Sequence, residues 1–194
     1  ELPHRIVQGS LRHLVAASRV DPPRSILRRA LERGEIIPLN KLMYRKGLAK
    51  VSQTPGKTAT INFYDVDGTD FVDLPGYGYA KVAKSEKGRW SEPIEGYFNQ
   101  DRRFALVVSL VDIRHDPSAL DMHMAKFLWE NDFPFAIALT KADKLSKQAA
   151  GKQASAIRKK LDLPKDTPFV VTSSSNGTGI DELRRLIDSY VAEA

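Results

Sequence analysis

The chain has 194 residues, is 42% apolar and contains no cysteine. These values predict one domain with a buried core, and they exclude a disulfide framework and a cysteine metal site. No apolar run approaches membrane-spanning length and no signal-peptide pattern opens the chain, so we expect a cytoplasmic protein without a membrane partner. The net charge of +6 is uneven, because residues 1–50 hold 11 Lys and Arg against 4 Asp and Glu, whereas residues 51–194 hold 19 against 20.

Residues 1–39 differ in composition from the rest of the chain. They contain seven arginines and no lysine, whereas residues 40–194 contain eight arginines and fifteen lysines. Residues 25–33 are compatible with a helix. We expect no buried strand in this segment, and therefore nothing that supplies the central strand of a sheet.

From about residue 40 onward, predicted strands alternate with predicted helices. Hairpin and apolar-run patterns predict strands at 62–66, 70–73, 104–111, 133–139 and 168–171. Apolar residues at helical spacing predict helices within 120–128, 154–161 and 180–191. The alternation predicts an α/β fold, a three-layer structure in which a mostly parallel sheet has one antiparallel edge strand and helices on both faces.

The first motif, Thr140-Lys141-Ala142-Asp143, directly follows a predicted buried strand. Ligands bind at the carboxyl ends of strands in open α/β sheets. A carboxylate at Asp143 can accept two parallel hydrogen bonds from guanine, which adenine does not offer, and the Lys141 stem can lie over the base. The alternative is a surface turn of mixed charge, but the position after a strand favours a guanine-reading loop.

The second motif, Asp73-Leu74-Pro75-Gly76, also ends a predicted strand. Asp73 is a candidate to hold Mg²⁺ through water, and the backbone N–H of Gly76 is a candidate to meet a γ-phosphate. An ordinary Pro-Gly turn is the alternative.

Two further segments complete the candidate nucleotide site. Thr58 is a candidate Mg²⁺ ligand within the predicted nucleotide-binding segment Gly56, Lys57, Thr58, Ala59 and Thr60. This segment is not a phosphate loop, because no glycine stands at 51 and a strand follows it instead of a helix. The last predicted strand ends before Thr172, Ser173 and Ser174, whose backbone groups are candidates to contact the guanine O6.

These motifs resemble the EngB/YsxC/YihA family of bacterial GTP-binding proteins over roughly residues 40–190. The resemblance is carried by the segments 46–49, 54–58, 62–63, 73–80, 111–115 and 140–143. It implies a P-loop GTPase-like fold, binding of GTP or GDP with Mg²⁺, and slow GTP hydrolysis. It also implies a role in assembling the large ribosomal subunit, with precursor rRNA as a partner, and in normal septation during cell division. We expect a monomer.

One family motif is missing. The family carries Gly-Arg-Ser-Asn-Val-Gly-Lys-Ser before the stretch that begins at Asn40, but this chain has Glu35 in place of the phosphate-binding lysine and Ile36 in place of the Mg²⁺-binding hydroxyl. We therefore divide the chain into an aberrant segment, 1–39, and a GTP-binding domain, 40–194. With this motif replaced, the sequence does not decide whether the chain hydrolyses GTP, and it indicates no catalytic residue.

We propose that residues up to about 39 are a frame-shifted reading of a normal gene of this family. One coding string for the family's strand and loop, read from one nucleotide upstream, translates as residues 24–38 of this chain. The arginine surplus agrees with an out-of-frame reading. The alternative is a diverged, nucleotide-free module that binds RNA or the ribosome and has lost its phosphate loop.

Overall fold

The computed structural model describes residues 13–17, 61–66, 69–74, 92–100 and 102–194. The strands are β1 (His13–Ala17), β2 (Asn62–Val66), β3 (Thr69–Leu74), β4 (Phe104–Asp112), β5 (Phe135–Thr140) and β6 (Phe169–Val171). The helices are α2 (Glu92–Phe98), α3 (Ala119–Glu130), the 3₁₀ turn η3 (Ala142–Lys144), α4 (Lys147–Leu161) and α5 (Ile180–Glu193). None of the described helices is long and apolar enough to cross a membrane.

The six described strands form one sheet in the order β2-β3-β1-β4-β5-β6. The pairs β4–β5 and β5–β6 are parallel, and β2 lies antiparallel to β3 at the edge. β1 lies between β3 and β4 and is antiparallel to both. Consequently β3, β4, β5 and β6 all run in the same direction, and their carboxyl ends share one edge of the sheet.

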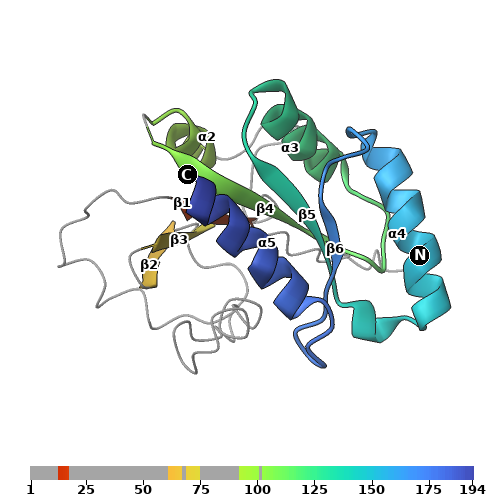
Figure 1. Ribbon diagram of the computed structural model, residues 1–194. Coiled ribbons are helices and arrows are strands. Elements are labelled where there is room, and N and C mark those ends of the chain that lie inside the picture. The colour runs from red at the N-terminus through yellow and green to blue at the C-terminus, as the bar shows by residue number, and fades with distance from the viewer. Residues whose placement is uncertain (1–12, 18–60, 67–68, 75–91, 101) are drawn as a thin grey trace, which may run out of the picture.

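Helices cover both faces of the sheet. α2, α3 and α4 pack on one face through a core that includes Ile94, Met124 and Ile157, while α5 packs on the other through Leu183 and Ile187. Figure 1 shows α5 crossing one face, with α3 and α4 away from it. These three layers confirm the predicted α/β class.

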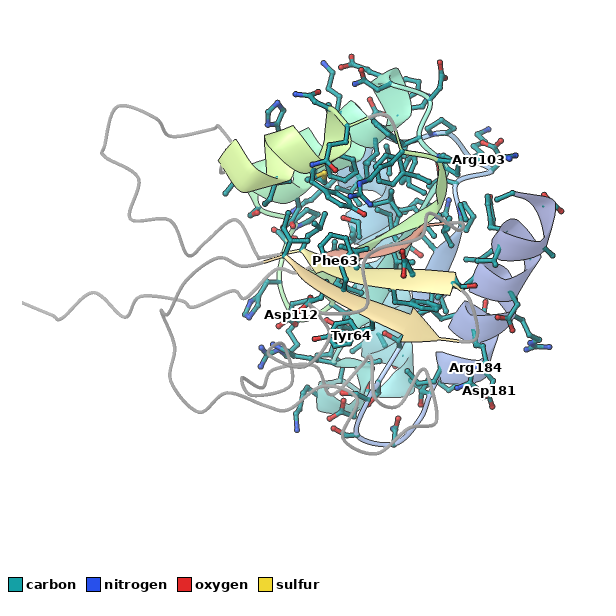
Figure 2. The ribbon with its side chains drawn as sticks, turned by 90° about the vertical axis from the view of Figure 1, so that its left-hand side faces the viewer. Phe63, Tyr64, Arg103, Asp112, Asp181 and Arg184 are labelled. Atoms are coloured by element: carbon teal, nitrogen blue, oxygen red, sulfur yellow. The ribbon has the colours of Figure 1, made fainter. Side chains whose placement is uncertain are left out.

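The alternation of side chains along β2 illustrates how the sequence sets these layers. Phe63 packs against the core under α2, whereas the next residue, Tyr64, packs with the core under α5. Figure 2 shows the two labelled rings on opposite sides of the strand. Successive side chains of a strand point to opposite faces, so this alternation fits a strand covered on both sides.

The structure departs from the sequence predictions in two elements. We expected no strand within residues 1–39, and this was wrong, because His13–Ala17 pairs with two strands in the middle of the sheet. α2 was not predicted, since its 7 residues are too few for a clear helical period. The candidate helix at 25–33 lies outside the described residues.

Candidate functional site

The carboxyl edge of the sheet brings together polar residues from four strands. Asp73 lies near the end of β3, Asp112 ends β4, and Asp143 and Ser173 follow β5 and β6. Figure 2 shows Asp112 at one end of the sheet and Arg103, which precedes β4, at the other. Parallel strands thus place three carboxylates and a hydroxyl on one edge, as in other ligand-binding α/β sheets.

Asp143 is held by two neighbours of different kinds. The hydroxyl of Ser173 donates to its Oδ1 at 2.6 Å, and the ammonium of Lys144 lies 3.2 Å from its Oδ2. The hydrogen bond from Ser173 lowers the pKa of Asp143 below its ordinary value, against the opposing effect of burial. The carboxylate is therefore ionised at neutral pH, and each oxygen retains a lone pair for a further donor.

Ser173 is itself fixed on every side. Its side chain is fully buried, and its Oγ accepts the backbone N–H groups of Ser175 at 3.2 Å and Asn176 at 3.4 Å. Its own backbone N–H donates to the carbonyl of Thr178 at 2.9 Å. Ser173 therefore acts through its hydroxyl, which orients Asp143, while its N–H is used within the loop.

The turn that follows depends on a glycine. Gly179 has φ +67°, and a Cβ placed there would lie 2.0 Å from the carbonyl oxygen of Val171. Only glycine combines a left-handed backbone with so close an approach. This contact seats the start of α5 against the end of β6 and fixes the carbonyl of Thr178 that binds Ser173.

Two main-chain hydrogen bonds tie the β5 and β6 loops together. The N–H of Ala142 donates to the carbonyl of Thr172 at 3.1 Å, and the N–H of Thr172 donates to the carbonyl of Leu139 at 2.7 Å. The buried hydroxyl of Thr172 donates to the same Leu139 carbonyl at 3.2 Å. Thr172 therefore joins the two loops and positions Asp143 relative to Ser173.

Lys141 is anchored by an acidic group from the neighbouring strand. It adopts a left-handed backbone, φ 63° and ψ 32°, and its Nζ donates to Oδ2 of Asp112 at 2.9 Å. Arg114 binds both oxygens of the same carboxylate, at 2.9 and 2.7 Å. Burial raises the pKa of Asp112, but the hydrogen bonds from Arg114 and Lys141 outweigh it and hold the pKa well below its usual range.

Sequence reasoning did not assign Asp112 and Arg114 to the site. Their signal is the sequence Val111-Asp112-Ile113-Arg114, in which charged residues alternate with apolar residues where a buried strand ends. The contact to Lys141 joins residues 29 positions apart, and it follows from the parallel pairing of Asp112 with Thr140.

The structure describes only some of the remaining predicted site residues. Gly56, Lys57, Thr58, Ala59, Thr60, Pro75 and Gly76 lie outside the described residues. The side chain of Leu74 is fully buried in the core under α2 to α4, and Ser174 is half-buried after β6. In the described part of the chain, no group of three His, Cys, Asp or Glu side chains is placed to hold a metal ion.

The chemistry of this edge suits a planar base that carries adjacent donors. An ionised carboxylate at Asp143 supplies two acceptor oxygens, and Lys141 supplies a long apolar stem whose charged end is held by Asp112. The edge is polar, but its acceptors are already oriented by Ser173 and by the loop backbone. Such preorganisation reduces the entropic cost of binding a ligand.

Comparisons with known proteins agree with this geometry. A family model described as a 50S ribosome-binding GTPase matches residues 38–141. The chain is 47% identical over 144 residues to the probable GTP-binding protein EngB of Streptococcus mutans, covering 74% of this chain and 73% of that protein. It is 47% identical over 147 residues to the protein of the same name from Syntrophomonas wolfei, covering 75% of each. A crystal structure of a probable GTP-binding protein EngB superposes with a TM-score of 0.62 at 20% identity, covering 88% of this chain and 96% of that one, which shows the shared fold.

Proposed function

The chain belongs to the EngB family, whose members are named as probable GTP-binding proteins, and on this premise we propose that its β5–β6 edge recognises the guanine base. The observation that supports this most strongly is the 2.6 Å hydrogen bond from Ser173 to Asp143. It fixes one carboxylate oxygen of a residue that follows β5, at the edge where a nucleotide binds in such sheets.

Selectivity for guanine follows from the acceptor character of Asp143. Guanine presents an N1–H and an exocyclic amine side by side, and an ionised carboxylate accepts from both. Adenine presents an acceptor at N1, which would face a negatively charged oxygen without a proton between them. A site that leaves buried polar groups unpaired rejects the wrong ligand strongly.

The residues present do not fit the triphosphate and its Mg²⁺ ion. Glu35 and Ile36 stand where the family motif has a lysine and a serine, so an acidic residue replaces the phosphate-binding cation of the motif. Of the two proposed Mg²⁺ ligands, Asp73 is described and Thr58 is not. We therefore expect this chain to bind the base selectively and the phosphates poorly, and we derive no hydrolytic step.

A role for the chain in the large ribosomal subunit is part of the proposal. It is supported by the match to a family model described as a 50S ribosome-binding GTPase. We further propose that the chain works as a cytoplasmic monomer in assembling that subunit and is required for normal septation. The competing function is a nucleotide-free module that binds RNA or the ribosome, which the loss of the phosphate-binding lysine favours.

A titration decides between these two functions. Fluorescent GTP and ATP analogues are titrated in Mg²⁺ buffer into two proteins. One is the chain with its present sequence, and the other is a variant that carries Gly-Arg-Ser-Asn-Val-Gly-Lys-Ser at positions 29–36. We expect the unchanged chain to prefer the guanine analogue, and the variant to bind that analogue far more tightly. Equal affinities of the two versions would show that the phosphate loop is dispensable or rebuilt elsewhere.

A variant pair tests the role of the carboxylate. Asp143→Ala removes both acceptors and should weaken guanine binding by roughly ten- to a hundredfold. Asp188→Ala, which removes an exposed carboxylate from α5, is the matched control and should leave binding unchanged. If Asp143→Ala keeps its preference for guanine over adenine, the base is read elsewhere.

A further inference from the structure

We propose that the exposed face of α4 is an RNA-binding surface that contacts the sugar–phosphate backbone through Lys147, Lys152 and Lys159. The inference deepens the proposed ribosomal role and rests on it, since it assigns the surface that would meet rRNA. The three residues are called the α4 lysines below.

Positive charge in the described structure gathers on α4 and its flanks. Residues 141–165 hold eight Lys and Arg against two Asp and Glu, and α4 itself has five basic residues and no acidic one. By contrast, α5 holds four acidic residues against two arginines, and α3 holds two against one lysine. The charge is therefore a property of one helix, and the other two long helices do not share it.

Two of the basic side chains of α4 already form contacts within the chain. Arg158 stacks over the ring of Phe169, 3.9 Å from its centroid, and donates to the carbonyls of Lys165 and Thr167. Lys160 pairs with Asp116. These contacts link α4 to β6 and, through an exposed ion pair, to the loop after β4, so both side chains already have partners within the chain.

The α4 lysines differ from Arg158 and Lys160 in their contacts. All three are exposed, and none forms an ion pair with any residue that the structure describes. Lys152 and Lys159 are two helical turns apart, so they lie on one line along the helix at a spacing of roughly 10 Å. Lys147 lies in the first turn of the helix, about 7.5 Å further toward its amino end and about 140° around the axis from Lys152, so it widens the charged surface instead of extending the line.

The face between these lysines is polar and open. Gln148, Gly151 and Ser155 are exposed there, and a Cβ built on Gly151 would have no atom within 4 Å. The apolar side chains Ile157 and Leu161 point into the core. Figure 1 shows α4 at the right-hand margin of the molecule.

The chemistry of this face favours RNA over a membrane or a protein. The large hydrophobic side chains that are exposed in the described structure, Met122 and Trp129, both belong to α3. A helix that lies on a membrane needs apolar side chains on its outer face, and protein interfaces are depleted of lysine and enriched in aromatic residues. Exposed lysines without large apolar side chains beside them match the repeated negative charges of a nucleic-acid backbone.

The surface also adjoins the candidate guanine site. α4 begins at Lys147, its N-cap is Ser146, and Asp143 lies three residues before that cap. The helix that carries the α4 lysines therefore starts directly after the loop that is proposed to read the base.

The test measures binding of a fluorescein-labelled 20-base-pair RNA duplex to the full chain by anisotropy at several salt concentrations. The triple substitution K147Q/K152Q/K159Q should weaken binding by about tenfold or more and lower the slope of log K against log salt by about 2. The conservative triple K147R/K152R/K159R should bind like the parent chain. A control triple on the other helices, K126Q/R184Q/R185Q, removes the same charge and should leave most of the affinity.

Three outcomes would overturn the inference. Equal losses in the two glutamine triples would show that only net charge matters. Unchanged binding in the α4 triple would place RNA elsewhere, for example on the arginine-rich segment 1–39, which all variants share. A defect of the α4 triple that appears with phosphatidylglycerol vesicles but not with RNA would make the surface a membrane contact. The guanine titration on the same α4 triple separates this inference from the proposed function, because base binding there should stay unchanged.

Discussion

Gly179→Ala tests whether the turn before α5 holds the candidate site in place. The new Cβ would lie 2.0 Å from the carbonyl oxygen of Val171 and 3.0 Å from its carbon. A left-handed alanine alone costs about 1–2 kcal/mol. Relieving the overlap requires a shift of the turn backbone by about 1 Å, so we expect a total loss of roughly 2–4 kcal/mol in the free energy of unfolding.

The same substitution at Gly151 provides an internal control. Gly151 lies in the middle of α4, and a Cβ there meets nothing within 4 Å. Because alanine is the better helix former, Gly151→Ala should raise the free energy of unfolding by about 0.5–1 kcal/mol. The same Gly→Ala change is thus expected to lower the free energy of unfolding at position 179 and to raise it at position 151.

Urea unfolding of both variants, followed by far-UV circular dichroism, measures the two effects. Titration with a fluorescent guanine nucleotide then asks whether the site is affected, because the displaced turn carries the Thr178 carbonyl that binds Ser173. We expect Gly179→Ala to weaken this binding and Gly151→Ala to leave it unchanged. If the two variants unfold with the same free energy, the close approach at Gly179 does not exist in solution.

Three shorter predictions concern the core, a helix cap and the site. The hydroxyl of Tyr97 is buried without a hydrogen-bond partner in the described structure, and burial raises the pKa of Tyr97 to about 12. Tyr97→Phe should therefore stabilise the chain by about 1 kcal/mol, and its advantage in urea unfolding should widen as pH rises from 10 toward 12. Ser118→Ala breaks the capping box that Ser118 forms with Asp121 at the start of α3 and should cost about 1 kcal/mol in the same assay. Asp112→Asn should lower the free energy of unfolding at pH 7. The difference in this free energy between variant and parent should shrink as pH falls below about 4, because the pKa of Asp112 is lowered in the folded chain. A difference that is constant with pH would contradict this.

The sequence predicted those parts of the fold that local patterns determine. The hairpin was predicted from Asp67-Gly68 between two β-rich runs, and β2 pairs with β3 in the register that such a turn requires. The parallel strands were predicted from unbroken apolar runs, because strands buried on both faces carry no polar alternation. β5 begins at Phe135, two residues after the predicted start, since Phe133 and Pro134 belong to the connection from α3.

The features that the sequence did not predict depend on contacts between distant residues. Ser173 meets Asp143 across 30 positions, and Lys141 meets Asp112 across 29. Each pair becomes visible only when the order and direction of the strands are known. Nearby sequence gives no sign that the hydroxyl of Ser173, instead of its backbone, would be the group that acts on Asp143.

The direction of β1 bears on whether this chain can build a phosphate loop. A phosphate loop follows the carboxyl end of a central strand that runs parallel to its neighbours. β1 runs the other way, because His13 pairs with Leu74 and Ser109 while Ala17 pairs with Asp70 and Phe104. The carboxyl end of β1 therefore lies at the edge opposite to Asp112 and Asp143, which is the wrong end of the sheet for a phosphate loop.

The occupied position between β3 and β4 has a simple physical reason. Without a strand there, both neighbours would leave backbone N–H and C=O groups unpaired in the interior, which is costly. An antiparallel strand satisfies those groups as well as a parallel one does. Pairing alone therefore does not supply a phosphate loop: His13–Ala17 fills the gap between β3 and β4, but its direction is incompatible with a phosphate loop directly after it. Because β1 runs antiparallel to its neighbours and Glu35 and Ile36 replace the lysine and serine of the family motif, we expect base recognition to survive in this chain and triphosphate binding to be lost.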